Sequence, residues 1–183
     1  MKKYGRLIPI EELRLLENMI HKQVDLLLFP FLHFTLGSQV YENMGPVTLV
    51  MNKRVDPHYY IIMNTWGEAE SFEDYGNLSI SKKKYPARIE CEDSSVGPVI
   101  SGNHASIRLF ATISSIEVYT IDHIHEDEHF LYDHALVFYF DDRDPLAIAV
   151  GPGAAVDPIE VTDHRDSIEE MIADSHLRRR LQA

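Results

Sequence analysis

The chain has 183 residues, of which 45% are hydrophobic and 25% charged, so it can fold around one core without a disulfide or a structural metal. Its formal net charge of −12 argues against non-specific nucleic-acid binding, which depends on lysine and arginine neutralising phosphates. The single cysteine, Cys91, excludes an intramolecular disulfide, no secretory signal is evident, and the most apolar run (24–36) is shorter than a membrane-spanning helix. We therefore expect a cytoplasmic protein without nucleic-acid or membrane partners.

The first predicted element is a helix from about Pro9 to Gln23. Pro9 suits the first helical position, and the acidic residues Glu11 and Glu12 complement the positive end of the helix dipole. Apolar residues recur at steps of three and four and form one stripe, which consists of Ile10, Leu13, Leu16, Ile20 and Val24.

Between residues 26 and 161 the pattern is that of strands and turns. Runs rich in β-forming residues predict strands at 26–36, 47–51, 59–63, 78–81 and 88–91, whereas 65–77 suits a loop or a short helix. The alternation of Ile107–Ile113 changes parity after Ser114-Ser115, which predicts a β-bulge. The runs 135–140 and 146–150 flank turn residues and predict a β-hairpin.

The C-terminal part predicts a loop (Gly151–Pro158), a short strand (Ile159–Val161) and a final helix. Thr162 or Asp163 can cap this helix, Ile168 and Met171 belong to its apolar side, and it extends as far as Leu177. The run Arg178-Arg179-Arg180 then fits the negative end of its dipole.

Together these elements predict an α+β fold: a predominantly antiparallel, strongly bent β-sheet, sandwich- or barrel-like, with an N-terminal and a C-terminal helix. Residues 1–183 are expected to form a single domain, with a weak seam near 82–97.

The segment Asp122–His134 holds four of the ten histidines and five carboxylates. Its position between two predicted strands favours a long, solvated hairpin loop. Alternatively it binds a divalent transition metal (zinc, nickel or manganese), because imidazole and carboxylate are the usual ligands of these ions. The ligands of such a site would be His123, His125, Asp127 and His129.

The spacing of this segment is similar to the His-x-His-x-Asp-His run of metallo-β-lactamase-like hydrolases. Here Glu128 stands between Asp127 and His129, which turns the last ligand away from its expected direction. The chain also lacks the alternation of strands and helices that such a fold requires. We therefore carry over neither the fold nor the activity.

A second candidate region combines aromatic and acidic residues. Five aromatic residues lie within seventeen positions and alternate with acids: Tyr59, Tyr60, Trp66, Phe72 and Tyr75, with Glu68, Glu70, Glu73 and Asp74. Such a mixture on an exposed loop is typical of a protein-recognition surface. Alternatively these aromatic residues complete the core beneath a long loop.

Three functions compete. The first is an acidic protein-interaction module that binds or neutralises a basic protein partner, as immunity-type proteins do with toxic nucleases; the acidic segments 68–74 and 122–144 support it. The second is a metal-dependent enzyme using the His123–His134 segment, with Asp127 or Glu128 as general base. The third is a structural protein that forms a homodimer. The chain has no recognised catalytic motif, so we lean against an enzyme.

Overall fold

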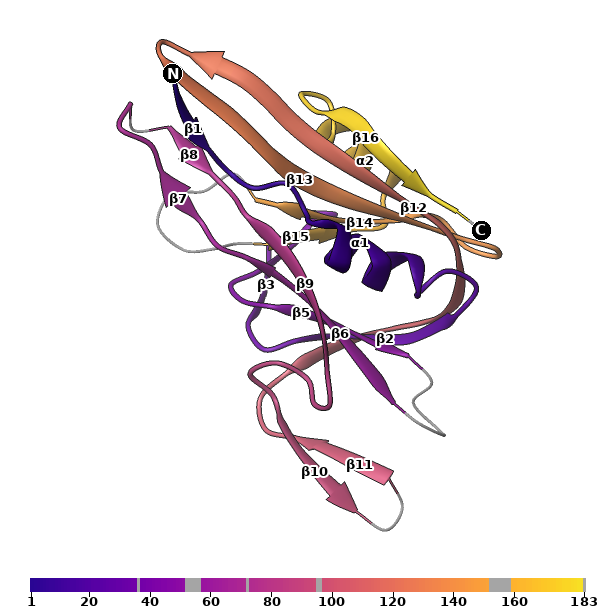
Figure 1. The fold of residues 1–183 in the computed structure, drawn as a ribbon. Coiled ribbons are helices and arrows are strands. Elements are labelled where there is room, and N and C mark those ends of the chain that lie inside the picture. Colours follow the sequence, from indigo (N-terminus) through magenta and orange to yellow (C-terminus); the bar gives the residue numbers. More distant parts are fainter. Residues whose placement is uncertain (36, 52–56, 72, 95–96, 152–158, 183) are drawn as a thin grey trace.

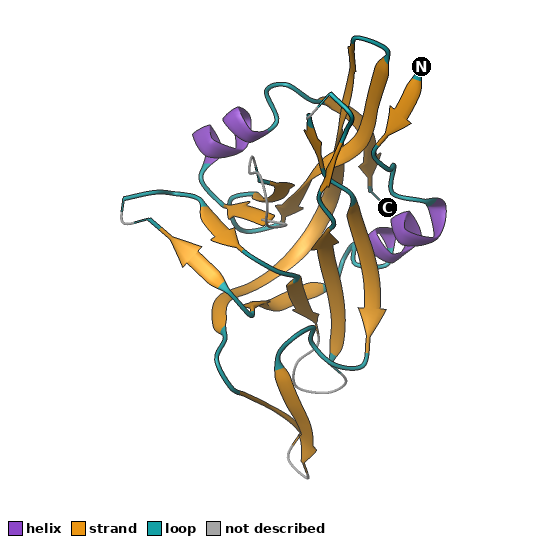
Figure 2. Ribbon diagram, turned by 90° about the vertical axis from the view of Figure 1, so that its left-hand side faces the viewer, coloured by secondary structure: helices purple, strands orange, loops and turns teal. Residues whose placement is uncertain are grey.

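The computed structural model describes residues 1–35, 37–51, 57–71, 73–94, 97–151 and 159–182. Within these ranges the chain is mostly antiparallel β-sheet, with two short helices, α1 (Ile10–Glu17) and α2 (Arg165–Met171) (Figures 1 and 2). The predicted antiparallel character is confirmed. The sheet stays open, so the barrel form of the prediction is not observed.

Ten strands follow one another across the main sheet, and their order is β3 (Leu32–Phe34), β4 (Tyr41–Asn43), β15 (Ile159–Thr162), β14 (Leu146–Val150), β13 (Glu128–Phe140), β12 (Ala105–His125), β2 (Gln23–Phe29), β5 (Val47–Met51), β6 (His58–Asn64) and β9 (Leu78–Lys83). Two further strands attach to the long central pair. β1 (Lys2–Tyr4) runs parallel to β13, and β16 (His176–Leu181) runs antiparallel to β12.

The bend of the sheet lies in β12. Its first part pairs with β2, whereas its later part pairs with β13 and β16, so one strand belongs to both halves of the sheet. The pairing shifts around Phe110, which has a left-handed φ of 49°, and again between Ile113 and Ser115. The second shift confirms the bulge predicted at Ser114-Ser115. Such irregularities bend a strand and increase its twist.

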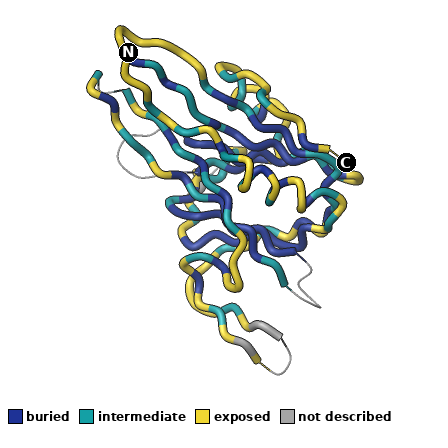
Figure 3. Tube along the Cα trace, viewed as in Figure 1, coloured by how far each residue is buried: buried dark blue, intermediate teal, exposed yellow. Residues whose placement is uncertain are grey.

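The core lies between the two halves of this sheet. Side chains such as Leu27, Leu49 and Phe138 are fully or almost fully buried in it, and Leu13 and Leu16 of α1 join the same cluster. Buried residues concentrate along the central strands, while the tip of the β12–β13 pair, residues 122–127, is exposed (Figure 3). Two members of the predicted apolar stripe, Leu13 and Leu16, thus hold α1 against the core, whereas Ile10 is exposed.

Smaller elements cover the outer faces. Ile168 of α2 packs on Val137 and Ala147, and Ile89 packs on the β2–β5–β6 side of the sheet.

The β10–β11 hairpin (Glu90–Ser94 and Gly97–Ser101) projects from the rest of the molecule (Figure 1). A second small hairpin, β7 (Gly67–Glu68) with β8 (Asp74–Tyr75), occupies the stretch predicted as a loop or short helix.

The N-terminal helix is shorter than predicted. It ends at Glu17, and residues 23–29 form β2, so Val24 is buried in a strand rather than in the last turn of a helix. His21 adopts a left-handed φ of 61°, and its N–H donates to the carbonyl of Ile113, which turns the chain into the sheet. The predicted strand 26–36 is interrupted at Pro30, where β2 has ended.

The prediction that Arg178–Arg180 end a helix is wrong. Helix α2 ends at Met171, and residues 176–181 form β16. The arginines at 178 and 180 form ion pairs with the buried carboxylates of Asp133 and Glu117 on the sheet. These pairs stabilise an extended conformation that local periodicity does not reveal.

The prediction of a long loop at 122–134 is also wrong. Strand β12 continues to His125 and β13 begins at Glu128, so only Glu126 and Asp127 form the turn, with Glu126 at a φ of 52°. We call the free end of this pair, residues 121–132, the ribbon. The predicted hairpin at 135–150 is confirmed by the β13–β14 pairing. Residues 152–158 of the predicted loop lie outside the described residues.

Candidate functional site

The histidines of the ribbon contact the β7–β8 hairpin. His123 and His125 lie two residues apart on β12 and therefore share a face. Nε2 of His123 lies 2.8 Å from Oε2 of Glu73, and Nδ1 of His125 lies 3.1 Å from Oε1 of the same carboxylate. Glu73 immediately precedes β8, so these contacts attach the hairpin to the ribbon.

The other two predicted ligands lie elsewhere. Nε2 of His129 is 2.8 Å from Oδ1 of Asp122, whereas Asp127 is in the exposed turn, where its carbonyl accepts from the N–H of Lys2. In the part of the chain that the structure describes, no group of three or more His, Cys, Asp or Glu side chains is arranged to hold a metal ion. Metal binding by this segment stays a prediction from the sequence alone.

Glu128 fixes the same hairpin from β13. Its buried carboxylate accepts from the N–H groups of Glu70 (3.2 Å) and Ser71 (3.3 Å) and from the Ser71 hydroxyl. The hydrogen bond from Ser71 foremost, with another from Tyr4, holds the pKa of Glu128 below its usual value despite burial. The ionised carboxylate thus satisfies two backbone donors of the hairpin.

Aromatic contacts complete the attachment. The Tyr75 ring lies 5.5 Å from that of Tyr4 and 6.4 Å from that of Phe130, on whose face His123 stacks at 4.8 Å. A Cβ at Gly67 would lie 2.4 Å from Cζ of Tyr75. Strand β7 can therefore lie this close to the Tyr75 ring only because residue 67 is a glycine.

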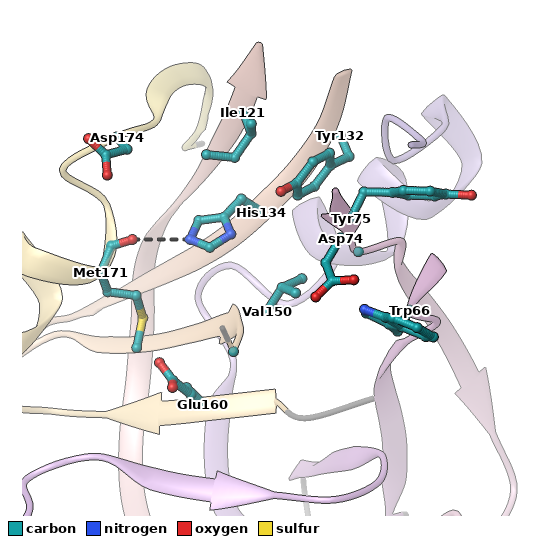
Figure 4. A pocket seen from close by; sticks show the side chains of 12 residues that line it. Trp66, Asp74, Tyr75, Ile121, Tyr132, His134, Val150, Glu160, Met171 and Asp174 are labelled. Carbon is teal, nitrogen blue, oxygen red and sulfur yellow. Dashed lines mark hydrogen bonds between the residues drawn. The ribbon is translucent and has the colours of Figure 1, made fainter. Parts of the chain in front are cut away.

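A cavity of about 540 Å³ lies beside the hairpin (Figure 4). Its aromatic lining consists of Trp66, Tyr75 and Tyr132, and its apolar lining includes Val150 and Met171. In Figure 4, Trp66 and Asp74 lie on one side of the cavity and Met171 and Asp174 on the other, with His134 between them. Burial foremost, with nearby acids, raises the pKa of Tyr132. We call this cavity the pocket.

The charged residues of the pocket are all acidic. Asp74 begins β8, Glu160 lies on β15 and Asp174 follows α2, and no lysine or arginine is among the described lining residues. Burial foremost, and then the charges of Glu42 and Glu170, raises the pKa of Glu160. Glu42 is its direct partner across β4–β15, an arrangement of like charges that is unfavourable unless a cation compensates it.

His134 adds a neutral acceptor to the pocket. Its Nε2 lies 3.1 Å from the carbonyl oxygen of Met171, which can only accept, so Nε2 carries the proton (Figure 4). Burial lowers the pKa of His134, which keeps the ring neutral near pH 7. Nδ1 is then an acceptor; it is buried and has no hydrogen-bond partner among the described residues.

Comparison of the chain with known protein families, curated proteins and solved structures found no match. The pocket is therefore interpreted from its own chemistry. Separately, neither described helix has the length and apolar character needed to cross a membrane.

The shape of the pocket depends on Gly76, which follows β8. A Cβ there would lie 2.6 Å from Cγ1 of Val150 and 2.9 Å from the Asn64 side-chain oxygen. Only glycine lets the chain after the hairpin pass so close to β14.

Some of the aromatic residues that the sequence analysis singled out lie in the pocket. The sequence places Trp66 and Tyr75 either on a recognition surface or in the core beneath a loop; both line the pocket, whereas Tyr59 and Tyr60 are buried in the sheet. Phe72 lies outside the described residues. Glu160 and Asp174 carry no signal in the sequence, because each is a single acid in an ordinary strand or helix end, and only the fold brings them to Asp74.

The predicted acidic surface at 122–144 is not continuous. Its exposed acids divide between the ribbon (Asp122, Glu126 and Asp127) and the β13–β14 turn that begins at Asp141, which lie at opposite ends of β13 (Figure 1), whereas Glu128 and Asp133 are buried. The acids of the pocket come instead from three separate parts of the chain.

Proposed function

We propose that this chain is a binding protein for a basic protein partner and that the pocket receives a cationic side chain of that partner. The lining of the pocket carries this proposal. It combines carboxylates with the aromatic residues Trp66, Tyr75 and Tyr132. Carboxylates form strong hydrogen bonds with cationic donors, and aromatic faces attract cations.

The unpaired acceptor of His134 supports the same function. A buried acceptor without a donor is unfavourable, and the pocket offers Nδ1 of His134 in that condition. A cationic ligand that brings N–H donors would satisfy it and would also compensate the repulsion around Glu160. An anionic or purely apolar ligand would do neither.

Trp66 makes this function testable without a label, because it is the only tryptophan of the chain and lines the pocket. We expect an arginine- and lysine-rich peptide to change the tryptophan fluorescence saturably at low salt, with an affinity that falls as salt is added. A glutamate-rich peptide of equal length should leave it unchanged.

Matched variants assign the binding to the pocket. Glu160→Gln and Asp74→Asn should weaken the basic peptide, whereas Glu169→Gln, which removes an exposed carboxylate of α2 outside the pocket, should not. Failure of the basic peptide to bind at low salt would contradict the proposed function.

A further inference from the structure

The hydrogen-bond acceptors of the pocket lie on several of its sides and not on one wall. Asp74 lies at the start of β8, Glu160 on β15 and His134 on β13, and Asp174 lies beyond Met171 (Figure 4). A cation that uses several of them must present donors in several directions at once.

The three common organic cations differ in this respect. A quaternary ammonium has no N–H and would leave Nδ1 of His134 unpaired. An alkylammonium has three donors on one compact, strongly hydrated centre. A guanidinium has five donors that diverge in one plane, and it is the more weakly hydrated of the two.

The remaining lining also favours a flat, weakly hydrated cation. The rings of Trp66, Tyr75 and Tyr132 provide flat surfaces, and a guanidinium stacks on such faces while its edge donates to acceptors. The apolar side chains of Val150 and Met171 can contact the methylene groups that carry it. A cavity of about 540 Å³ has room for both.

We infer, on the basis of the proposed function, that the pocket is an arginine site. The guanidinium of a partner's arginine donates to the Asp74 and Glu160 carboxylates and to Nδ1 of His134, and it lies against the aromatic lining. Arginine, rather than basic charge in general, then determines which partners bind tightly.

Four small probes test this inference by tryptophan fluorescence and calorimetry: N-acetyl-arginine amide, N-acetyl-lysine amide, N-acetyl-citrulline amide and tetramethylammonium. Citrulline keeps the shape of arginine but is neutral, so it separates charge from shape. We expect the arginine amide to bind, and the lysine and citrulline amides to bind at least about tenfold more weakly, since each loses a charged hydrogen bond. Tetramethylammonium should not bind.

Two variants connect the preference to named atoms. Glu160→Gln and His134→Phe should each reduce the affinity for the arginine amide, with an unchanged near-ultraviolet spectrum as the check on folding. His134→Phe keeps an aromatic ring but removes the Nδ1 acceptor. Glu169→Gln, with the same charge change as Glu160→Gln, should bind like the unmodified protein.

The possible failures are distinguishable. Equal binding of the arginine and lysine amides would overturn the arginine preference while the proposed function stands. If the basic peptide binds but the arginine amide neither competes with it nor responds to Glu160→Gln, the pocket is not the arginine site. If neither the peptide nor any cation binds, the proposed function itself fails.

Discussion

The protonation state of the His134 ring determines which class of ligand the pocket can bind. Its Nε2–H is held by the Met171 carbonyl, so in the proposed site the buried Nδ1 is the nitrogen that accepts from the ligand. The ring accepts a hydrogen bond only while it is neutral. Burial, which lowers the pKa of His134, therefore preserves the acceptor at neutral pH.

We expect cation binding to weaken as the pH falls below the ordinary histidine value of 6.5. Because the pKa of His134 in the folded protein is lowered, the ring gains its proton below that value; protonation then turns Nδ1 into a donor and adds a positive charge beside the ligand. Protonation of Glu160, whose pKa is raised, acts in the same direction. The measurement is the Kd of the arginine amide between about pH 8 and about pH 5.

The control for this prediction is the double variant His134→Phe with Glu160→Gln, whose weaker affinity should change less over the same range. Binding that is constant, or that strengthens in acid, would contradict the role assigned to His134.

Among the elements, the strands of the core were the most predictable. The hairpin at 135–150 and the parity change at Ser114-Ser115 are local signals, and the structure has both. The ribbon was missed because its histidines and acids resemble a solvated loop. It is extended because β1 and the β7–β8 hairpin contact it, through Glu128 and Glu73 above all.

Strand β16 was missed for a related reason. Its sequence, with three consecutive arginines, suits the end of a helix by itself, but two of them have buried partners on the sheet. Asp133 is fully buried and accepts from Arg178, from the N–H of Ile8 and from the Thr120 hydroxyl. No local pattern reveals a carboxylate that lies far away along the chain.

The Asp133–Arg178 pair predicts a measurable loss of stability. Arg178→Ala leaves the carboxylate of Asp133 buried without its cation, and breaking a buried ion pair in this way costs about 3–5 kcal/mol. Urea unfolding followed by circular dichroism measures the loss.

The matched control is Arg179→Ala, at the exposed neighbouring position, for which the change should stay within about 0.5 kcal/mol. Equal effects of the two substitutions would show that β16 is not held by this pair.

At the scale of the whole molecule, composition and arrangement play different parts. The net charge of −12 follows directly from the sequence. The positions of the charged side chains on the folded molecule could not be predicted from it. The two acidic turns at the ends of β13 lie outside the pocket, whose own acids are few. Distant charges and pocket charges should therefore affect different steps of binding.

Charges outside an interface mainly accelerate the encounter, whereas desolvated pairs within it determine how slowly the complex dissociates. We therefore expect neutralisation of three exposed acids, Glu126→Gln, Asp142→Asn and Glu169→Gln together, to slow association of the basic peptide while dissociation is unchanged. Glu160→Gln should instead accelerate dissociation, with a small effect on association.

Stopped-flow tryptophan fluorescence at several salt concentrations separates the two rate constants. The triple variant should also show a shallower dependence of association on salt, because a smaller net charge attracts the peptide less over distance. If the triple variant dissociates faster, the peptide is held by the exposed acids rather than by the pocket. If Glu160→Gln alters association alone, Glu160 acts as part of the general field and does not contact the ligand.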